Sequence, residues 1–306
     1  MLKSVDNIDK ILFSKEFICN FKRAIKEFYN YEEYMDFLIV PSIFGGKALS
    51  YLPILSYTDR NSSDIIDLLE LSKESEYQIR VLNFDYKNFR DGDTVTMRIN
   101  IDGRSSDEIL MENMKSKYRK VIKNSIKKND FTFVFGNSRK FIEDFYLVYS
   151  DIMYKHGTPP LDEKFFFELS RKLLECVLFY NVYDNENIIA SYCVFIDSNL
   201  AYGAWGGADD RYRDRLLGHF AYWNIIKDLA DNRKIKVFDF GRSPFGSGGY
   251  VFKHRFGARA VKVEIISSQE SDIYSKYSLA SSIWKRLPRK ITDLAGPKLC
   301  KYLVDL

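Results

Sequence analysis

Cysteine and histidine are scarce in this chain, and a membrane-spanning run is missing. The 306 residues include four widely separated cysteines and three histidines. Two cysteines lie in apolar strand-like runs, which favours reduced core thiols over a disulfide framework. The histidines have no metal-ligand spacing with cysteine or carboxylate, so no metal site is predicted. No apolar run reaches the roughly 18 residues of a transmembrane helix, and residues 1–6 lack a signal peptide's apolar core. We therefore expect a cytoplasmic protein.

A strong charge of either sign is also lacking. The formal net charge is only +4, which implies no bulk attraction to nucleic acid. Apolar residues make up 46% of the chain and aromatic residues 16%. This composition supplies material for a packed core, and the length suits two domains of ordinary size or one large one.

The second half of the chain alternates predicted strands and helices. Apolar runs separated by turn signals indicate the order β-α-α-β-β-β-α-β-α-β. The expected elements are strand 131–135, helices 138–155 and 161–174, strands 177–183, 188–196 and 200–205, helix 217–230, strand 237–240, a helix from residue 250, and strand 260–267. This alternation predicts an α/β (α+β) fold with mixed sheets flanked by helices.

The first half and the tail differ from this pattern. Strands are expected at 37–40, 79–84 and 94–101, followed by one long helix over 105–128 whose second half is rich in lysine. Between residues 282 and 301 the tail has six basic residues against one acid. We expect three segments: an N-terminal domain at 1–130, a C-terminal domain at 131–270 and a basic tail at 271–306.

The stretch 237–258 is the most informative part of the chain. An acid, Asp239, lies within an apolar strand, and Arg242 follows a glycine, which places charge at the carboxyl end of a strand, where α/β sheets bind ligands. On the next helix, Tyr250, Lys253 and His254 fall at i, i+3 and i+4 and share one face. Arg242 and Lys253 suit a phosphate or carboxylate ligand.

Acid–base roles follow from the same residues. Asp239 is the first choice as the base that takes a proton from an amine, with His254 as the alternative, and Tyr250 is the acid that protonates a leaving thiolate. A second interpretation stays open for each: Asp239 as a turn-capping acid and His254 as an ordinary surface residue.

The loop after the third central strand is the candidate donor site. Gly206 and Gly207 end the strand with small residues that permit close backbone approach. Arg211, Arg213 and Arg215 follow, and a helix begins close to Gly218, where unpaired amides and the helix dipole stabilise anions. A solvated arginine loop is the alternative interpretation.

Residues 154–162 link two helices through a Gly-Thr-Pro-Pro segment that includes His156 and Thr158. A rigid loop of this kind either shapes an acceptor pocket or forms a simple helix-to-helix corner.

Several of these motifs together resemble the FemAB-like proteins with a GNAT-type (N-acetyltransferase) domain, and in particular those associated with exopolysaccharide and PEP-CTERM gene clusters. The resemblance is carried from about residue 105 to the end. The motifs are Asp239-Phe240-Gly241-Arg242-Ser243, the glycine-rich turn before Tyr250, Phe252-Lys253, Phe256-Gly257, Gly157-Thr158-Pro159, Phe165-Phe166, Tyr118-Arg119-Lys120, Trp284-Lys285-Arg286-Leu287-Pro288 and Gly296-Pro297.

The resemblance implies two tandem GNAT-like domains, with a degenerate N-terminal copy. It also implies that Arg215 and Gly218 correspond to the loop that holds the coenzyme A pyrophosphate, although Phe220 stands where a small residue is usual. The acceptor-side residues it implies are Arg119, Thr158, Arg242, Ser243, Tyr250 and Lys253.

The expected activity is that of an acyltransferase. An acyl group would pass from acyl-CoA (acetyl-CoA or longer) to the amine of a nucleotide- or lipid-linked amino sugar in surface polysaccharide synthesis, with amides near Gly206 and Gly207 polarising the carbonyl. One alternative is an aminoacyl-tRNA-dependent transferase that acts on a peptidoglycan or envelope precursor, the only case in which nucleic acid is a partner. Another is a non-catalytic GNAT-like scaffold. The basic tail either packs on its own domain or lies on the inner membrane face.

Overall fold

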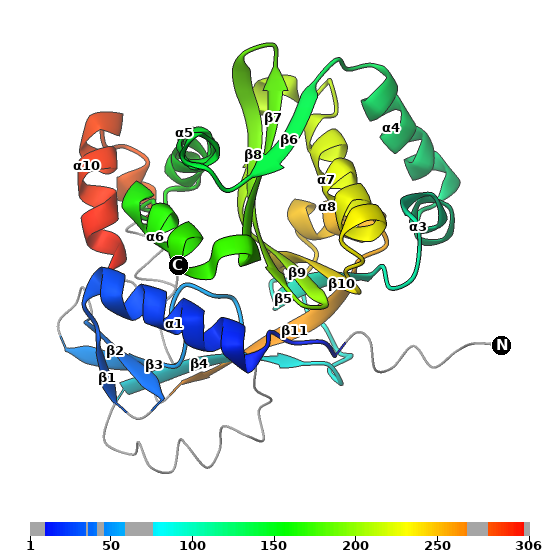
Figure 1. Cartoon of the computed structure of the whole chain (residues 1–306). Helices are drawn as coiled ribbons and strands as arrows, with labels where there is room; N and C mark the ends of the chain where they lie inside the picture. The colour runs from blue at the N-terminus through cyan, green and yellow to red at the C-terminus, as the bar shows by residue number, and fades with distance from the viewer. Residues whose placement is uncertain (1–9, 35, 42–45, 59–75, 268–280, 303–306) are drawn as a thin grey trace. The chain divides into compact units, whose positions relative to one another are not determined.

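The structure is a computed structural model that describes residues 10–34, 36–41, 46–58, 76–267 and 281–302 (Figure 1). The chain forms two compact units that interleave along the sequence. Unit 1 comprises residues 1–14, 83–148 and 175–263, and unit 2 comprises residues 15–82, 149–174 and 264–306. Neither unit is one continuous stretch, and the boundaries expected at residues 130 and 270 stay a prediction.

Unit 1 is built on a mixed sheet with the strand order β11-β5-β10-β9-β8-β7-β6. Its strands are β5 (Thr94–Asn100), β6 (Thr132–Gly136), β7 (Val177–Asp184), β8 (Asn187–Asp197), β9 (Leu200–Ala208), β10 (Val237–Pro244) and β11 (Arg259–Ser267). Neighbouring strands are antiparallel except β9 and β10, which run parallel. Strand β5 comes from the first half of the chain, yet it pairs with both β10 and β11.

The element order predicted for the second half of the chain is confirmed. The helices that complete it are α5 (Arg139–His156), α6 (Glu163–Leu173), α7 (Leu217–Lys227) and α8 (Gly248–Arg255). A five-residue π-helical turn extends α7 through Asn232. The expected boundaries are close to the observed ones, because the apolar runs and the turn residues mark them in the sequence.

The single helix predicted over 105–128 is wrong. The structure has two helices, α3 (Ser106–Asn113) and α4 (Ser116–Lys127), with the chain extended at Met114 and Lys115. Ser105 and Glu108 form a capping box at the start of α3, worth about 1 kcal/mol. The break is stabilised by Arg119, which donates hydrogen bonds to the carbonyls of Met111 and Met114, at 2.7 and 3.1 Å.

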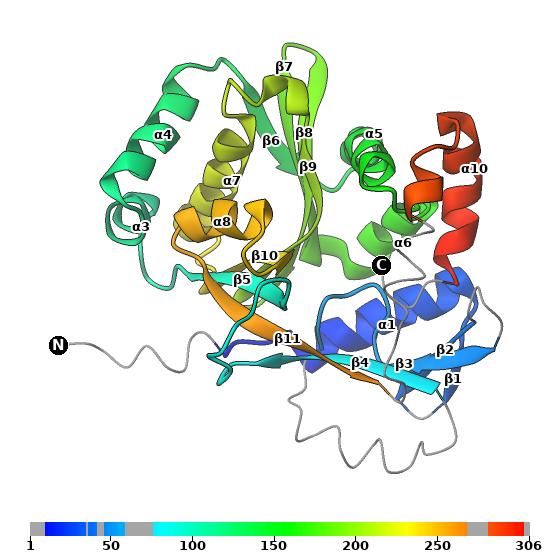
Figure 2. The same ribbon diagram turned by 180° about the vertical axis from the view of Figure 1, so that it is seen from behind.

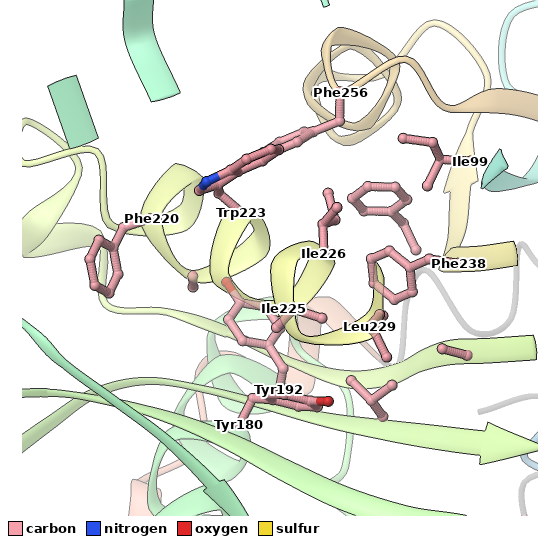
Figure 3. Packing of buried hydrophobic residues seen from close by; sticks show 14 of the residues in the cluster. Ile99, Tyr180, Tyr192, Phe220, Trp223, Ile225, Ile226, Leu229, Phe238 and Phe256 are labelled. Atoms are coloured by element: carbon pink, nitrogen blue, oxygen red, sulfur yellow. The ribbon is translucent and has the colours of Figure 1, made fainter. Parts of the chain in front are cut away.

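Helices cover both faces of this sheet. Figures 1 and 2 show α3, α4, α7 and α8 on one side of strands β6–β9 and α5 on the other. Helix α7 is apolar on several faces, which fits its position between the sheet and its neighbouring helices. Figure 3 shows Trp223 of α7 beside Phe256, with Ile226 and Phe238 in the same core. This packing holds the body of α7 and the end of α8 against the core of unit 1.

The described part of unit 2 contains strands β1 to β4 and helices α1, α6 and α10. The strands are β1 (Glu32–Tyr34), β2 (Phe37–Pro41), β3 (Lys47–Ser50) and β4 (Glu76–Asn83), in that order; β1–β2 and β2–β3 are antiparallel and β3–β4 is parallel. Helix α1 (Lys15–Tyr29) packs on α6, where the rings of Phe28 and Phe165 lie 5.4 Å apart. Helix α10 (Arg289–Cys300) ends the described chain. Within the described residues, no helix is long and apolar enough to cross a membrane.

Candidate active site

The parallel strands β9 and β10 part at their carboxyl ends. Their paired register runs from Leu200↔Val237 to Tyr202↔Asp239 and then stops. Beyond that point β9 stays paired with β8, and β10 stays paired with β5. Gly241 marks the separation, because its φ is +77° and an added Cβ would lie 2.6 Å from the carbonyl oxygen of Gly203. Two neighbouring strand ends therefore present their backbone and loops at one edge of the sheet, where α/β folds bind ligands.

The glycines at the end of β9 have a structural requirement. Gly206 pairs with Tyr192 and Gly207 with Ser191, both on β8. Gly206 has φ +137°, and a Cβ there would lie 2.2 Å from the carbonyl oxygen of Ser191. Close approach to β8 thus explains Gly206 without a ligand, and donor binding by this pair stays a prediction.

Each arginine of the predicted donor loop has a carboxylate partner. Arg211 pairs with Asp209 and Arg213 with Asp210, both at 2.6 Å, and these two arginine side chains are largely exposed. Arg215 lies 2.8 Å from Asp184 and stacks over the Phe131 ring at 4.3 Å. The solvated arginine loop foreseen as the alternative thus describes Arg211 and Arg213, whereas Arg215 is packed.

Helix α7 begins directly after this arginine loop. Its N-cap, Leu216, is left-handed with φ 58° and provides no side-chain cap, so the first amides of the helix lack that partner. Gly218 faces the Phe252 ring, 3.7 Å from where its Cβ would be. Phe220 is 6% exposed and packs edge-on against Phe131, so this large residue occupies the core.

Asp239 is the centre of a buried network under the end of β10. Its side chain is fully buried and lies 3.4 Å from Arg98 Nε on β5, a side chain that is itself 1% exposed. Thr96 donates to one carboxylate oxygen at 2.5 Å, and the Gly241 amide donates to the same oxygen at 2.8 Å. The register of β10 against β5 shifts between Asp239 and Arg242, opposite these residues. The carboxylate thus holds a bulge in β10.

Lys253 of α8 rests on that bulge. Its ammonium donates to the carbonyls of Gly241 at 3.1 Å and Arg242 at 2.9 Å. An ammonium has three N–H donors, and the third has no partner among the described residues. Burial lowers the pKa of Lys253 to about 8, Asp239 opposes that change, and Arg242 adds to it. The result is a cation at the strand end with one donor to spare.

Tyr250 and His254 lie along the same helix, as their spacing predicted. Their rings are stacked with centroids 5.7 Å apart and planes 6° apart. His254 is exposed, and its Nδ1 lies 3.1 Å from the carbonyl oxygen of Ala258. Because a carbonyl only accepts, Nδ1 carries the proton in a neutral ring, and Nε2 keeps its lone pair. Ser243, 7% exposed, donates to the Arg242 carbonyl at 2.8 Å.

Three of the predicted substrate residues, Arg119, His156 and Thr158, belong to other segments of the chain. Arg119 caps α3, as described above. His156 and Thr158 belong to unit 2, where the Thr158 amide donates to Met153 at 2.9 Å and the Ser281 hydroxyl donates to the His156 carbonyl at 3.3 Å. Their acceptor role stays a prediction. No group of three or more potential metal ligands occurs in the part of the chain that the structure describes.

Two residues of this edge were missed in the sequence, Thr96 and Arg98. The signal available was an arginine inside an apolar strand run, since a buried arginine needs a partner. The identity of that partner depends on the pairing of β5 with β10, which no local pattern reveals.

Comparison with known proteins agrees with this geometry. Residues 112–254 match the family model described as acetyltransferase (GNAT) domain, which spans α4 to α8. A crystal structure of FemX is similar over 89% of this chain and 99% of that chain, with 13% identity and a TM-score of 0.57. No curated protein matches the chain.

Two further solved structures share the fold. One is the C-terminal domain of a putative lysylphosphatidylglycerol synthetase from Agrobacterium fabrum, with 12% identity, 90% of this chain and 94% of that chain covered, and a TM-score of 0.54. The other is L-PGS from Bacillus licheniformis, with 12% identity, coverages of 90% and 98%, and a TM-score of 0.52. At such identities the likeness concerns the fold, and the predicted α/β class with GNAT-type architecture is confirmed.

Proposed function

We propose that this chain transfers an acyl group from acyl-CoA to the amine of a nucleotide- or lipid-linked amino sugar for surface polysaccharide synthesis. The match of residues 112–254 to the acetyltransferase (GNAT) domain supports an acyl transfer. The observation that carries this proposal is the ammonium of Lys253. It is held by two carbonyls at the parting of β9 and β10, with one donor unused. A donor placed there stabilises negative charge on a reacting carbonyl or anchors an anionic group of the acceptor.

Two side chains of α8 are proposed to carry out the proton transfers of the reaction. The acceptor nitrogen attacks the thioester carbonyl, a C–N bond forms and the C–S bond breaks. The proton of the attacking amine passes to Nε2 of His254, and the departing thiolate takes a proton from the hydroxyl of Tyr250. Asp239 has no exposed surface, so we assign it the positioning of the bulge in place of the base role expected from the sequence.

The first amides of α7 are the proposed donor-side anion site. They belong to a helix start without a side-chain cap, and a pyrophosphate is stabilised there by the helix dipole. The neighbouring arginines are neutralised by aspartates, so backbone amides contribute most of the attraction. When bound, coenzyme A supplies the activated thioester. The chain's own residues position it.

A second candidate is aminoacyl transfer to an envelope molecule from charged tRNA. Helix α4 favours it, because one face bears exposed lysines that have no ion-pair partner among the described residues. They are Lys117, Lys120, Lys123, Lys127 and Lys128. A single-sign face of this kind suits a phosphate backbone. The names of the lysylphosphatidylglycerol synthetases are consistent with such chemistry, but those names describe those proteins alone.

One assay separates the candidates. The purified chain is incubated with acetyl-CoA and a set of UDP-linked amino sugars, and thiol release is followed; parallel samples receive aminoacylated tRNA and the same acceptors. Thiol release that needs both acetyl-CoA and an amino sugar supports the proposal. Aminoacyl transfer without thiol release supports the second candidate. If neither donor reacts nor raises the unfolding temperature, the non-catalytic scaffold is the better description.

A further inference from the structure

The basic tail exposes aliphatic side chains that a helix packed on its own unit would be expected to bury. Helix α10 is drawn in red beside α6 in Figure 1. On it, Leu294 is 70% exposed and Ile291 is 50% exposed, and Ile283 just before the helix is 54% exposed. Large aliphatic side chains exposed close together often mark an interaction surface.

The other side of the tail is anchored. Trp284 is 8% exposed, and Thr292 and Cys300 of α10 are at most 1% exposed. The Cys300 thiol donates to the carbonyl of Pro160 at 3.0 Å. The tail therefore packs on unit 2, which was one expectation from the sequence. Its orientation is fixed, so the residues that remain exposed form a defined face.

This outer face combines aliphatic and cationic side chains. Lys290, Leu294 and Lys298 follow one another at i, i+4 and i+8, and Ile291 lies beside them on the helical wheel. We call these four residues the tail face. Both lysines are exposed and have no ion-pair partner among the described residues.

The nearby acids do not neutralise the tail face. Asp293 and Asp151 both pair with Arg289, at 2.8 and 3.0 Å. Asp151 also pairs with Lys155 at 2.7 Å. The lysines of the tail face thus keep their full charge beside two exposed aliphatic side chains.

We propose that the tail face docks the protein on an anionic lipid bilayer surface. Such a surface attracts each lysine near it and accepts aliphatic side chains at the level of the headgroups. A nucleic acid would use the lysines but would leave Ile291 and Leu294 in water. Helix α4 is less suited to a bilayer, because Tyr118 and Ile122 on its apolar side are buried and only Ile126, at 42%, is an exposed aliphatic side chain on it.

The experiment is vesicle flotation of the full chain with phosphatidylcholine vesicles, with and without phosphatidylglycerol. Binding is expected only to vesicles that contain phosphatidylglycerol. A Lys290→Gln/Lys298→Gln variant should bind about thirtyfold more weakly, since each lysine near an anionic surface contributes about fivefold. An Ile291→Ser/Leu294→Ser variant should lose the part of the binding that survives high salt.

The matched control removes two lysines from the other basic helix. Lys120→Gln/Lys123→Gln changes the net charge by the same amount and should leave flotation within about twofold of the starting protein. Equal loss in both lysine pairs would reduce the effect to general charge and overturn the proposal. The absence of binding to phosphatidylglycerol vesicles would also overturn it. So would a result in which RNA displaces the protein from the vesicles and the Ile291→Ser/Leu294→Ser variant binds them as well as the unmodified chain does. The readout needs no substrate, so it stands or fails separately from the proposed acyl transfer.

Discussion

The two parallel strands β9 and β10 both end among cationic side chains, but the cations are held differently. After β9, Arg211, Arg213 and Arg215 each pair with an aspartate at 2.8 Å or less. After β10, Lys253 is held by two neutral carbonyls, above a carboxylate that belongs to another cation, Arg98. The first arrangement cancels charge at the surface. The second keeps a cation partly buried with a donor unused, which is the arrangement that chemistry can use.

The largest expected effect concerns the buried ion pair under β10. Asp239→Asn leaves Arg98 charged and uncompensated in the core, which should cost about 3–5 kcal/mol of unfolding free energy. Urea denaturation measures it. The control is Asp184→Asn, which breaks the half-exposed pair with Arg215 and should cost about 1 kcal/mol or less. If both variants lose a similar, small amount of unfolding free energy, the ion pair under β10 is no more important to stability than the pair after β9.

Removal of the Lys253 ammonium should have an effect of nearly the same size, but on the reaction rate in place of stability. Lys253→Met keeps the length of the side chain and deletes the donor, so kcat should fall about 10²–10³-fold, as for other lost donors to a developing oxyanion. Lys262→Met is the matched control, because Lys262 is also partly buried but pairs with Asp93 at 2.7 Å. Steady-state rates with acetyl-CoA and the acceptor give the comparison. An unchanged kcat in Lys253→Met would remove this residue from the chemistry.

The pH dependence tests the same cation. Because burial lowers the pKa of Lys253 to about 8, the ammonium form is lost above that pH, and the rate should fall there about tenfold per unit. Lys253→Arg, charged at every accessible pH, should remove this alkaline limb even if its rate is lower overall. For stability the sign is opposite: the folded pKa lies below the ordinary 10.5, so stability attributable to Lys253 rises from about pH 8 to 10.5. A rate that stays flat up to pH 10 would assign the activity to other groups.

Local pattern was enough to predict much of this edge. The strand that begins at Val237, the helix after it and the shared face of Tyr250 and His254 all follow from sequence spacing, and the stacked rings confirm the last. The strand continues past the predicted end at Phe240 to Pro244. These features depend on contacts between residues a few positions apart, which periodicity encodes.

The partners of Asp239 could not be predicted in the same way. Thr96 lies 143 positions away in the chain, and only the β5–β10 pairing brings the two together. The bulge that turns the Gly241 and Arg242 carbonyls toward Lys253 depends on the same pairing. The break at Met114 was missed for a related reason, because helical periodicity continues through a position whose cap comes from Arg119.

The donor side should respond more weakly to substitution. Arg215→Ala removes the pair with Asp184 and the stacking on Phe131, and it should raise the KM for acyl-CoA about tenfold while kcat changes little. Arg213→Ala, which loses only an exposed pair, should leave KM unchanged. The two variants are compared by kinetics and by the rise in unfolding temperature on addition of acetyl-CoA. An identical rise in Arg215→Ala and the unmodified chain would exclude Arg215 from the donor site.

The smallest effect concerns His219, in the first turn of α7. Its ring lies 5.4 Å from Tyr118 and 5.1 Å from Phe252, and burial, with a further contribution from Arg255, lowers its pKa from 6.5 to about 4. Unfolded chains take up this proton near pH 6.5, so the stability contributed by the neutral ring is lost progressively as the pH falls from 6.5 to 4. His219→Phe should therefore lose less stability over that range, measured by thermal unfolding. A neutral ring here adds no charge at the start of α7, consistent with a donor side that attracts anions through its backbone amides. If the variant and the unmodified chain lose stability in parallel, His219 is protonated in the folded state. The start of α7 then carries a cation of its own, and the difference between the two strand ends becomes smaller.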